Sequence, residues 1–158
     1  MKFNLKSALR TILPVLITAI LGTIFQKFAS FDYETINKPY LAPPKIVFPI
    51  VWTILYILIA ISAYIFDSKS DDREEKIRGL IIFYIGLLFN ALWPLFYFTL
   101  NLKLFAAIWL GMLYVISASN FVAFRKKDKI SGYLLIPYLI WLLFALYLNI
   151  GTAILNYN

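Results

Sequence analysis

The chain has 158 residues, of which 62% are hydrophobic, and a mean hydropathy of +0.80. A soluble domain of this length cannot bury that much apolar surface, so a soluble globular protein is excluded. The absence of cysteine and histidine excludes disulfide bonds, thiolate or imidazole metal sites and general-base catalysis by histidine. The net charge of +7 comes from lysines and arginines in predicted loops, which indicates membrane topology and not nucleic-acid binding.

Long uncharged runs predict five transmembrane helices. Four runs exceed the length of about 20 residues that crosses a bilayer. The shorter first run, Thr11 to Gln26, is extended because Lys27 can snorkel to the interface, and it lacks the cleavage site of a signal peptide. We therefore expect an all-α membrane protein with one domain over residues 1–158. Its helices are predicted at about 9–29, 46–66, 77–100, 104–124 and 131–155.

Charge asymmetry predicts the orientation of this bundle. Eleven basic residues lie on the side of the N-terminus and four on the other side, so the positive-inside rule places the N-terminus in the cytoplasm of a bacterial-type cell. The eleven are Lys2, Lys6, Arg10, Lys69, Arg73, Lys76, Arg78, Arg125, Lys126, Lys127 and Lys129. The four are Lys27, Lys38, Lys45 and Lys103.

The segment 30–45 is the one long connection, and a loop of about 16 residues between packed helices is usually functional. Pro39, Pro43 and Pro44 hold it extended, because each fixes φ and disfavours helix in the residue before it. Pro49 falls in the first turn of the next helix, where a missing N–H costs little. The sequence thus predicts a rigid lid above Trp52.

The other connections are short. Asp67 to Lys76 is predicted as a solvated loop in which Asp72 caps a helix beginning near Arg73, and all eight acidic residues are expected outside the helices. The turn at 101–103 makes the third and fourth helices an antiparallel hairpin, and Ala107-x-x-x-Gly111 favours close helix packing. Trp109, a few residues from Lys103, is expected either in ordinary packing or in an interfacial belt.

Aromatic stripes run along three helices at helical spacing. The stripes are Trp52, Leu55 or Tyr56, and Ile59; then Phe83, Asn90, Trp93 and Tyr97; and finally Tyr138, Trp141, Phe144 or Ala145, and Asn149. Such stripes form either ordinary packing or a ligand pocket. The amides of Asn90 and Asn149 should face the bundle interior, where they either bond between helices or contact a ligand.

An aromatic, apolar cavity with a few amides suits a large planar ligand. Lys38 and Lys45 would meet either an anionic group on that ligand or lipid headgroups. Because no histidine or cysteine can ligate iron, a metal-free tetrapyrrole is favoured over haem, and no metal or cofactor is expected.

Three motifs follow one another along the chain. The first is Tyr33 followed by Lys38-Pro39-x-x-x-Pro43-Pro44-x-x-Val47-Phe48-x-x-Val51-Trp52-x-x-Leu55-Tyr56. The second is Leu88-x-Asn90-x-x-Trp93 with Phe96, Tyr97 and Phe98. The third is Pro137-Tyr138-x-x-Trp141-x-x-Phe144-Ala145-x-x-Leu148-Asn149. Together they resemble the TspO/MBR family of tryptophan-rich sensory proteins, which includes the mitochondrial translocator protein, over most of the chain from about residue 31.

The resemblance implies a five-helix bundle, often a homodimer, that binds porphyrins or similar planar ligands under its first loop. It implies pocket roles for Trp52 and Trp141, with Tyr33, Asn90 and Ala145 as further lining. The candidate ligand-binding residues are Tyr33, Lys38, Pro43, Pro44, Val47, Phe48, Trp52, Tyr56, Asn90, Trp93, Tyr97, Tyr138, Trp141, Ala145 and Asn149.

The chain departs from the family at Asp32, where tryptophan is usual, and at Pro94, where serine is frequent and where a kink is expected. No basic residue follows Gly132, so a sterol motif is not carried over. The leading hypothesis is a membrane receptor for tetrapyrroles, with the bilayer as its surroundings. The alternatives are light- and oxygen-dependent porphyrin breakdown using Trp52 and Trp141, and facilitated tetrapyrrole transport.

Overall fold

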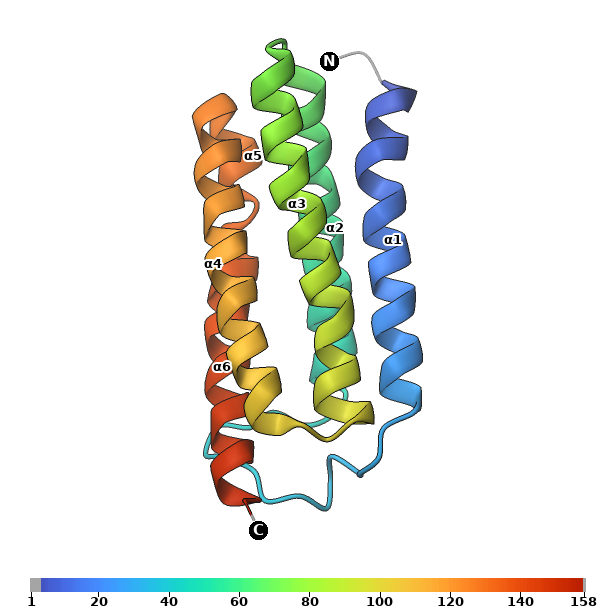
Figure 1. The fold of residues 1–158 in the computed structure, drawn as a ribbon, viewed down its shortest axis with the longest axis vertical. Coiled ribbons are helices and arrows are strands. Elements are labelled where there is room, and N and C mark those ends of the chain that lie inside the picture. The colour runs from blue at the N-terminus through green and yellow to red at the C-terminus, as the bar shows by residue number, and fades with distance from the viewer. Residues whose placement is uncertain (1–3, 158) are drawn as a thin grey trace.

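The computed structural model describes residues 4–157, and within them five helices are long and apolar enough to cross a membrane. The elements are α1 (Leu5–Lys27), α2 (Val47–Lys69), α3 (Arg73–Pro94), the π-helix η1 (Leu95–Thr99), α4 (Lys103–Lys127), α5 (Lys129–Tyr133) and α6 (Ile136–Leu155). The third span is α3 with η1, and the fifth is α5 with α6. The predicted all-α bundle is confirmed (Figure 1).

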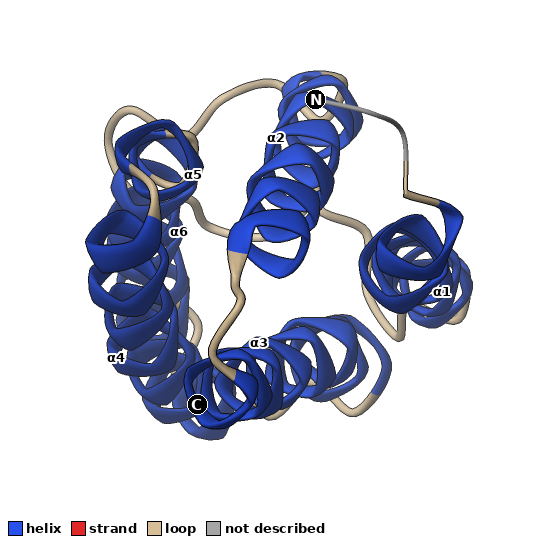
Figure 2. Ribbon diagram, turned by 90° about the horizontal axis from the view of Figure 1, so that it is seen from above, coloured by secondary structure: helices blue, strands red, loops and turns tan. Residues whose placement is uncertain are grey.

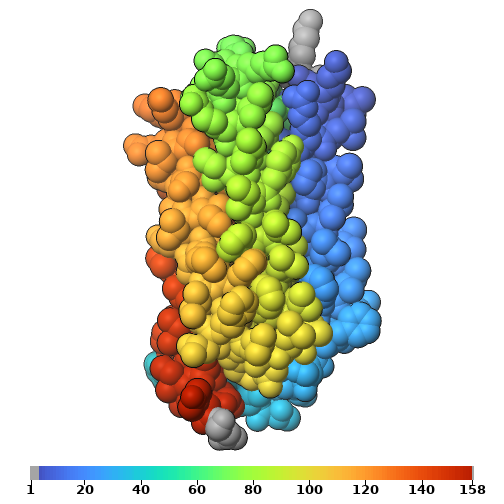
Figure 3. Space-filling model, in the orientation of Figure 1, coloured from blue at the N-terminus to red at the C-terminus, as the bar shows by residue number. Residues whose placement is uncertain are grey.

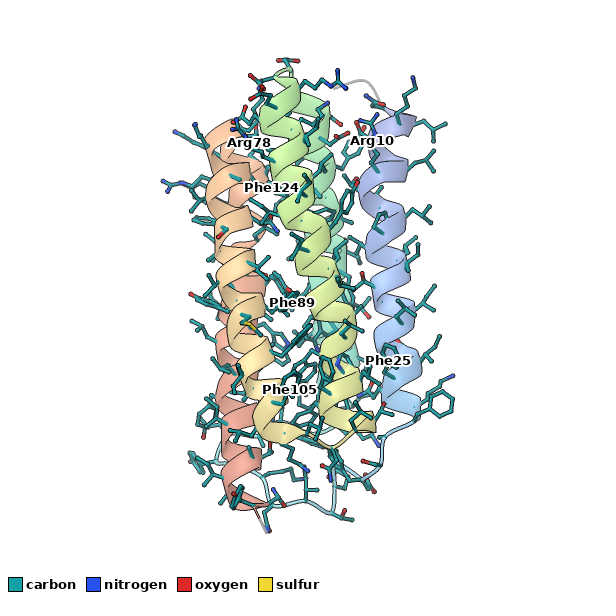
Figure 4. All side chains as sticks on the ribbon, viewed as in Figure 1. Arg10, Phe25, Arg78, Phe89, Phe105 and Phe124 are labelled. Carbon is teal, nitrogen blue, oxygen red and sulfur yellow. The ribbon has the colours of Figure 1, made fainter. Side chains whose placement is uncertain are left out.

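The helices form a ring when seen along the bundle (Figure 2). α1 packs against α2 and α3, α3 against α4, and α4 against α5 and α6, while α2 also contacts α5. The start of α1 lies at the same end as the α2–α3 and α4–α5 connections, and the loop of residues 30–45, called the lid loop below, lies with the end of α6 at the other end (Figure 1). Figure 4 places Arg10 and Arg78 at the N-terminal end and Phe25 and Phe105 toward the lid end.

A side-chain cap stands before α1 and before α3. Asn4 accepts a hydrogen bond from the Ser7 N–H, and α1 starts at Leu5, earlier than predicted. Asp72 accepts from the Glu75 N–H, and α3 begins at Arg73, as predicted for a helix capped by Asp72.

Prolines interrupt the third and fifth spans. Pro94 lacks the N–H that would continue the α-helical pattern, and the chain passes there into η1, in which the Leu100 N–H reaches the Leu95 carbonyl. Pro137 stands in the first turn of α6, so the helix predicted at 131–155 is instead two helices separated after Tyr133. The predicted kink at Pro94 thus takes the form of a change in helix type.

Close helix contacts occur at glycines other than the predicted one. A Cβ on Gly132 would lie 2.6 Å from the Arg125 Cα, so the α4–α5 turn depends on its missing side chain. A Cβ on Gly79 would lie 2.3 Å from the ring of Phe66, which stacks on Phe124 at 4.2 Å. A Cβ on Gly111 would meet nothing within 4 Å among the described residues, so the expected close approach there is not made.

The expectation that every acidic residue lies outside the helices is wrong. Asp67 belongs to the last two turns of α2 and is fully buried, 3.7 Å from Arg10 Nη1 of α1 and 3.9 Å from Lys76 Nζ of α3. Glu74 and Glu75 form the first turn of α3. The hydrophobic run ended at Phe66, but helix propensity does not stop where hydropathy does, and two cations on neighbouring helices compensate the buried carboxylate.

Candidate ligand-binding site

A cavity of about 200 Å³ lies between α1, α2 and the α3–η1 span, in the half of the bundle near the lid loop. On the face that Figure 3 shows, side chains of α1, α3 and α4 meet along the bundle, so the gaps between the ribbons are largely filled there. The cavity is lined by Ala19, Gly22, Thr23, Gln26, Phe48, Pro49, Trp52, Thr53, Tyr56, Asn90, Trp93, Pro94 and Phe98. Five of the fifteen predicted site residues are among them.

Trp52 forms the aromatic wall on the α2 side. Its ring lies 5.5 Å from that of Tyr56 and 6.3 Å from that of Tyr138. Half-buried and held by these neighbours, the indole presents a flat surface toward the cavity. An aromatic ring in this position stacks favourably on another flat ring.

Asn90 joins three helices and also lines the cavity. Its Oδ1 accepts a 2.9 Å hydrogen bond from the Tyr56 hydroxyl, and its Nδ2 donates at 2.8 Å to the Tyr138 hydroxyl. An amide has two acceptor lone pairs and two donor hydrogens, so each group keeps capacity for one more bond. The two roles that the sequence left open for Asn90 are therefore compatible.

Asn149 takes the interhelical role. It accepts from the indole N–H of Trp93 at 3.0 Å and donates to the Lys103 carbonyl at 2.8 Å, linking α6 to α3 and α4. Next to it the Tyr97 and Thr152 hydroxyls lie 2.9 Å apart. These bonds fix the Trp93 ring at the cavity wall.

Phe48 divides the candidate residues into two groups. On its far side, between the lid loop, the α3–η1 span and α6, lies a small cavity of about 30 Å³. That cavity is lined in part by Tyr33, Phe48, Trp93, Tyr97, Ala145 and Asn149. Trp93 and Phe98 also line both spaces, so a ligand that bridges them must displace one or more of these three rings.

Trp141 stands apart from Trp52. Its ring meets the edge of Phe48 at 6.0 Å and lies 5.5 Å from Phe144, and it is not among the residues that line the larger cavity. Its Nε1 is buried and has no hydrogen-bond partner within residues 4–157. Tyr138, one turn before Trp141 on the same helix, contacts the Trp52 ring edge-to-face, and its hydroxyl accepts the hydrogen bond from Asn90.

The lid loop is fastened to α6. Tyr147 donates to the Tyr40 carbonyl at 2.5 Å, and Asn156 donates to the Asn37 carbonyl at 2.8 Å. A Cβ on Gly151 would lie 2.6 Å from Pro39, so the loop rests directly on the helix there. The predicted lid is thus a tightly attached segment.

Other lid residues hold the loop together internally. The buried Tyr33 hydroxyl donates to the Pro43 carbonyl at 3.1 Å, and burial raises the pKa of Tyr33 to about 12, so the donor stays protonated. Pro44 accepts from the Val47 N–H at the start of α2. Lys38 pairs with Glu34 at 3.1 Å and Lys45 with Asp32 at 3.8 Å, so both lysines already have acidic partners.

The wall contributed by α1 is missing from the sequence prediction. Ala19, Gly22, Thr23 and Gln26 follow the i, i+3, i+4, i+7 pattern of one helix face. That face consists of small or polar residues in an otherwise Ile- and Leu-rich helix, and this contrast was the available signal. Trp109, expected in ordinary packing or in a belt, stacks on Phe89 at 4.0 Å and donates to its carbonyl at 2.8 Å.

Comparison with known proteins adds the family context. The model of the TspO/MBR family matches residues 11–155. The "Tryptophan-rich protein TspO" of Chlorobaculum tepidum is 33% identical over 135 residues, which cover 85% of each chain. The "Tryptophan-rich sensory protein" of Cereibacter sphaeroides is 32% identical, over 80% of this chain and 77% of the relative. The "Translocator protein" of Ovis aries is 28% identical over 82% of this chain and 78% of its own length.

Proposed function

Because the chain belongs to the TspO/MBR family, we propose that it is a multi-pass membrane receptor for a flat, largely apolar ligand, of the kind represented by metal-free porphyrins. The ligand lies in the cavity between α1, α2 and α3. The names of the relatives, a tryptophan-rich sensory protein and a translocator protein among them, support a sensory or translocating role.

The single observation that carries the proposal is the composition of the cavity wall. Two tryptophans, Trp52 and Trp93, line it together with the amide of Asn90, which keeps free hydrogen-bonding capacity. Flat aromatic surfaces with one fixed polar group are what a macrocycle with apolar faces and central nitrogen atoms requires. Lys45 lies at the edge of a gap that shares Gln26, Phe48 and Phe98 with the cavity, and it would meet an acidic substituent of the ligand by exchanging its partner Asp32.

Porphyrin titration of the purified protein tests this function. Binding is followed by the absorbance of the porphyrin, because the variants remove tryptophan fluorescence. Trp52→Phe shrinks the stacking surface and should weaken binding by about fivefold, equivalent to about 1 kcal/mol. Trp109→Phe is the matched control, since Trp109 stacks on Phe89 outside the cavity. Equal affinities for both variants would remove the stacking role of Trp52.

Light-dependent breakdown of the bound porphyrin is a second candidate function, favoured by the run of rings from Trp52 to Tyr56 and Tyr138. An excited porphyrin would take one electron from the Trp52 indole, and the porphyrin radical anion would add O₂. Return of one electron to the indole radical cation would leave an oxygenated macrocycle, so that porphyrin and O₂ are consumed and the indole is restored. Trp141, on the far side of Phe48, would act at longer range. Loss of porphyrin absorbance under light, slowed in Trp52→Phe but not in Trp109→Phe, supports this activity; a rate equal to that of porphyrin in detergent opposes it.

The proposal also includes passage of the ligand across the membrane and a dimeric state. Facilitated passage of the ligand is measured by porphyrin flux into liposomes, with and without the protein. A homodimer is expected from the family resemblance, and mass measurement of the detergent-solubilised protein tests it.

A further inference from the structure

A second, larger hollow lies on the outside of the bundle between α1 and α2. It has a volume of about 410 Å³, and its walls include Leu16 and Ala19 of α1 and Thr53, Tyr56 and Ile57 of α2. Leu16 is 54% exposed and Ile57 55% exposed, and in a bilayer both contact lipid. We refer to this hollow as the α1–α2 groove.

The groove adjoins the cavity directly. Ala19, Thr53 and Tyr56 line both spaces, so these three side chains form the shared boundary between the groove and the proposed binding site. Two of the three are small. The Thr53 hydroxyl donates to the Pro49 carbonyl of its own helix at 2.7 Å, so it already has a partner and presents a methyl group at modest desolvation cost.

The space at the lid end of the cavity is far smaller than the α1–α2 groove. The gap beneath the lid loop, lined in part by Tyr33, Lys45 and Phe48, has a volume of about 40 Å³. Above it the loop is held to α6 by Tyr147, by the Asn37–Asn156 pair and by the contact of Pro39 with Gly151. Opening this end requires breaking several hydrogen bonds together.

The α1 wall is less buried than the α2 wall and the third span. In its most apolar stretch 22% of the residues are buried, compared with 44% in the third span, so fewer packing contacts oppose its displacement. The cavity of about 200 Å³ is also smaller than the range of about 300–1,000 Å³ typical of small-molecule sites, whereas the groove falls within it.

We propose that the ligand enters sideways from the bilayer, through the α1–α2 groove and past Ala19 and Thr53, and that one apolar edge of it remains in the groove. This inference rests on the proposed function and adds a restriction on the ligand. Flat molecules that partition into the hydrocarbon region reach the site, and water-soluble analogues with charges around the whole ring do not. The lid loop then serves as a fixed cover.

Reversible cross-links test the route, because the chain has no native cysteine. Leu16→Cys with Ile57→Cys places thiols on the two walls of the groove, and a flexible bifunctional thiosulfonate joins them across it. Asn37→Cys with Asn156→Cys clamps the lid in the same way. Association of protoporphyrin is followed by stopped-flow absorbance in phosphatidylcholine nanodiscs, before cross-linking, after it and after reduction.

We expect the groove cross-link to slow association by about tenfold, with recovery on reduction, and the lid cross-link to change it by less than about twofold. The rate of each cysteine variant before cross-linking is the baseline for that variant, and recovery of this rate on reduction shows that the cross-link, and not the substitution, slows association. An unchanged rate in the cross-linked groove, with normal binding by the wild type, overturns lateral entry alone. Absence of saturable protoporphyrin binding by the wild type overturns both lateral entry and the proposed function.

Discussion

The indole N–H of Trp93 donates a 3.0 Å hydrogen bond to Oδ1 of Asn149, across the interface between α3 and α6. Both residues are buried. The bond fixes the plane of a ring that lines the cavity, and Asn149 extends the connection to the Lys103 carbonyl. The binding surface is thus held by helix packing and does not depend on a ligand for its shape.

Replacement of Asn149 by alanine should lower the free energy of unfolding by about 1–3 kcal/mol, because the Trp93 N–H and the Lys103 carbonyl lose their partner. Unfolding in mixed detergent with increasing dodecyl sulfate measures this change. Ile154→Ala, on the exposed surface of the same helix, is the control and should have a smaller effect. Equal losses in the two variants would mean that the hydrogen bonds contribute little.

The ion pairs of Asp67 should respond asymmetrically to substitution. Asp67→Asn removes a buried charge and leaves Arg10 and Lys76, which both reach solvent, so we expect a change below about 1 kcal/mol. Lys76→Met leaves the buried carboxylate with less compensation and should cost more, about 2 kcal/mol or above. The same unfolding experiment compares the two. A larger loss in Asp67→Asn than in Lys76→Met would contradict this view of the cluster.

Asp128 should make stability depend on pH. The hydrogen bond from Lys69 at 2.5 Å and that from the Ser131 N–H hold the pKa of Asp128 below its usual range. A carboxyl group with a lowered folded-state pKa stabilises the fold above its unfolded value of about 3.9, and this contribution is lost as the pH falls through the folded value. Wild type should therefore exceed Asp128→Asn in stability at about pH 7 but not below about pH 3.

The size of that difference is expected to stay below about 1 kcal/mol, because Lys69 is partly exposed. Asparagine still caps α5, so Asp128→Asn isolates the charge, whereas Asp128→Ala also removes the cap and should cost about 1 kcal/mol more at every pH. Unfolding curves at several pH values check both variants. A difference between wild type and Asp128→Asn that persists at low pH would exclude the charge as its origin.

Gly132 and Gly111 provide a matched pair of substitutions, of which only the first should destabilise the fold. Gly132→Ala introduces a Cβ 2.6 Å from the Arg125 Cα and 2.8 Å from its N, so the α4–α5 turn must open, at a cost of about 2 kcal/mol or more. Gly111→Ala meets nothing within 4 Å among the described residues and should be neutral or stabilising by up to about 1 kcal/mol, through helix propensity. Thermal unfolding in detergent measures both. Similar melting temperatures would mean that the α4–α5 turn adapts freely.

Hydropathy and spacing predicted the five spans and the interior face of the third helix. Phe83, Asn90, Trp93 and Tyr97 are all buried, as their seven-, three- and four-residue intervals indicate. The absence of helix between residues 30 and 45 also followed from the prolines of that loop, because their effect on the backbone is local. Each of these features depends on the sequence of a single segment.

Features that depend on two segments were missed. The separation of Trp52 from Trp141 is set by Phe48, whose ring position depends on how α2 and α6 pack. The contribution of α1 arises because a helix without an aromatic stripe happens to face Trp52 and Asn90. The burial of Asp67 likewise depends on Arg10 and Lys76 of two other helices. The sequence of α2 alone cannot indicate these partners.

The most direct test of the cavity as the binding site is the affinity of Gly22→Leu for protoporphyrin, measured by porphyrin absorbance. Gly22, Pro94 and Tyr56 all line the cavity. A Cβ on Gly22 would lie 3.6 Å from the Pro94 side chain and 3.9 Å from the Tyr56 hydroxyl. A leucine there occupies the space of the ligand and should weaken binding by about tenfold or more, whereas Gly111→Leu should leave binding unchanged. Wild-type affinity in a folded Gly22→Leu variant would contradict the location of the site.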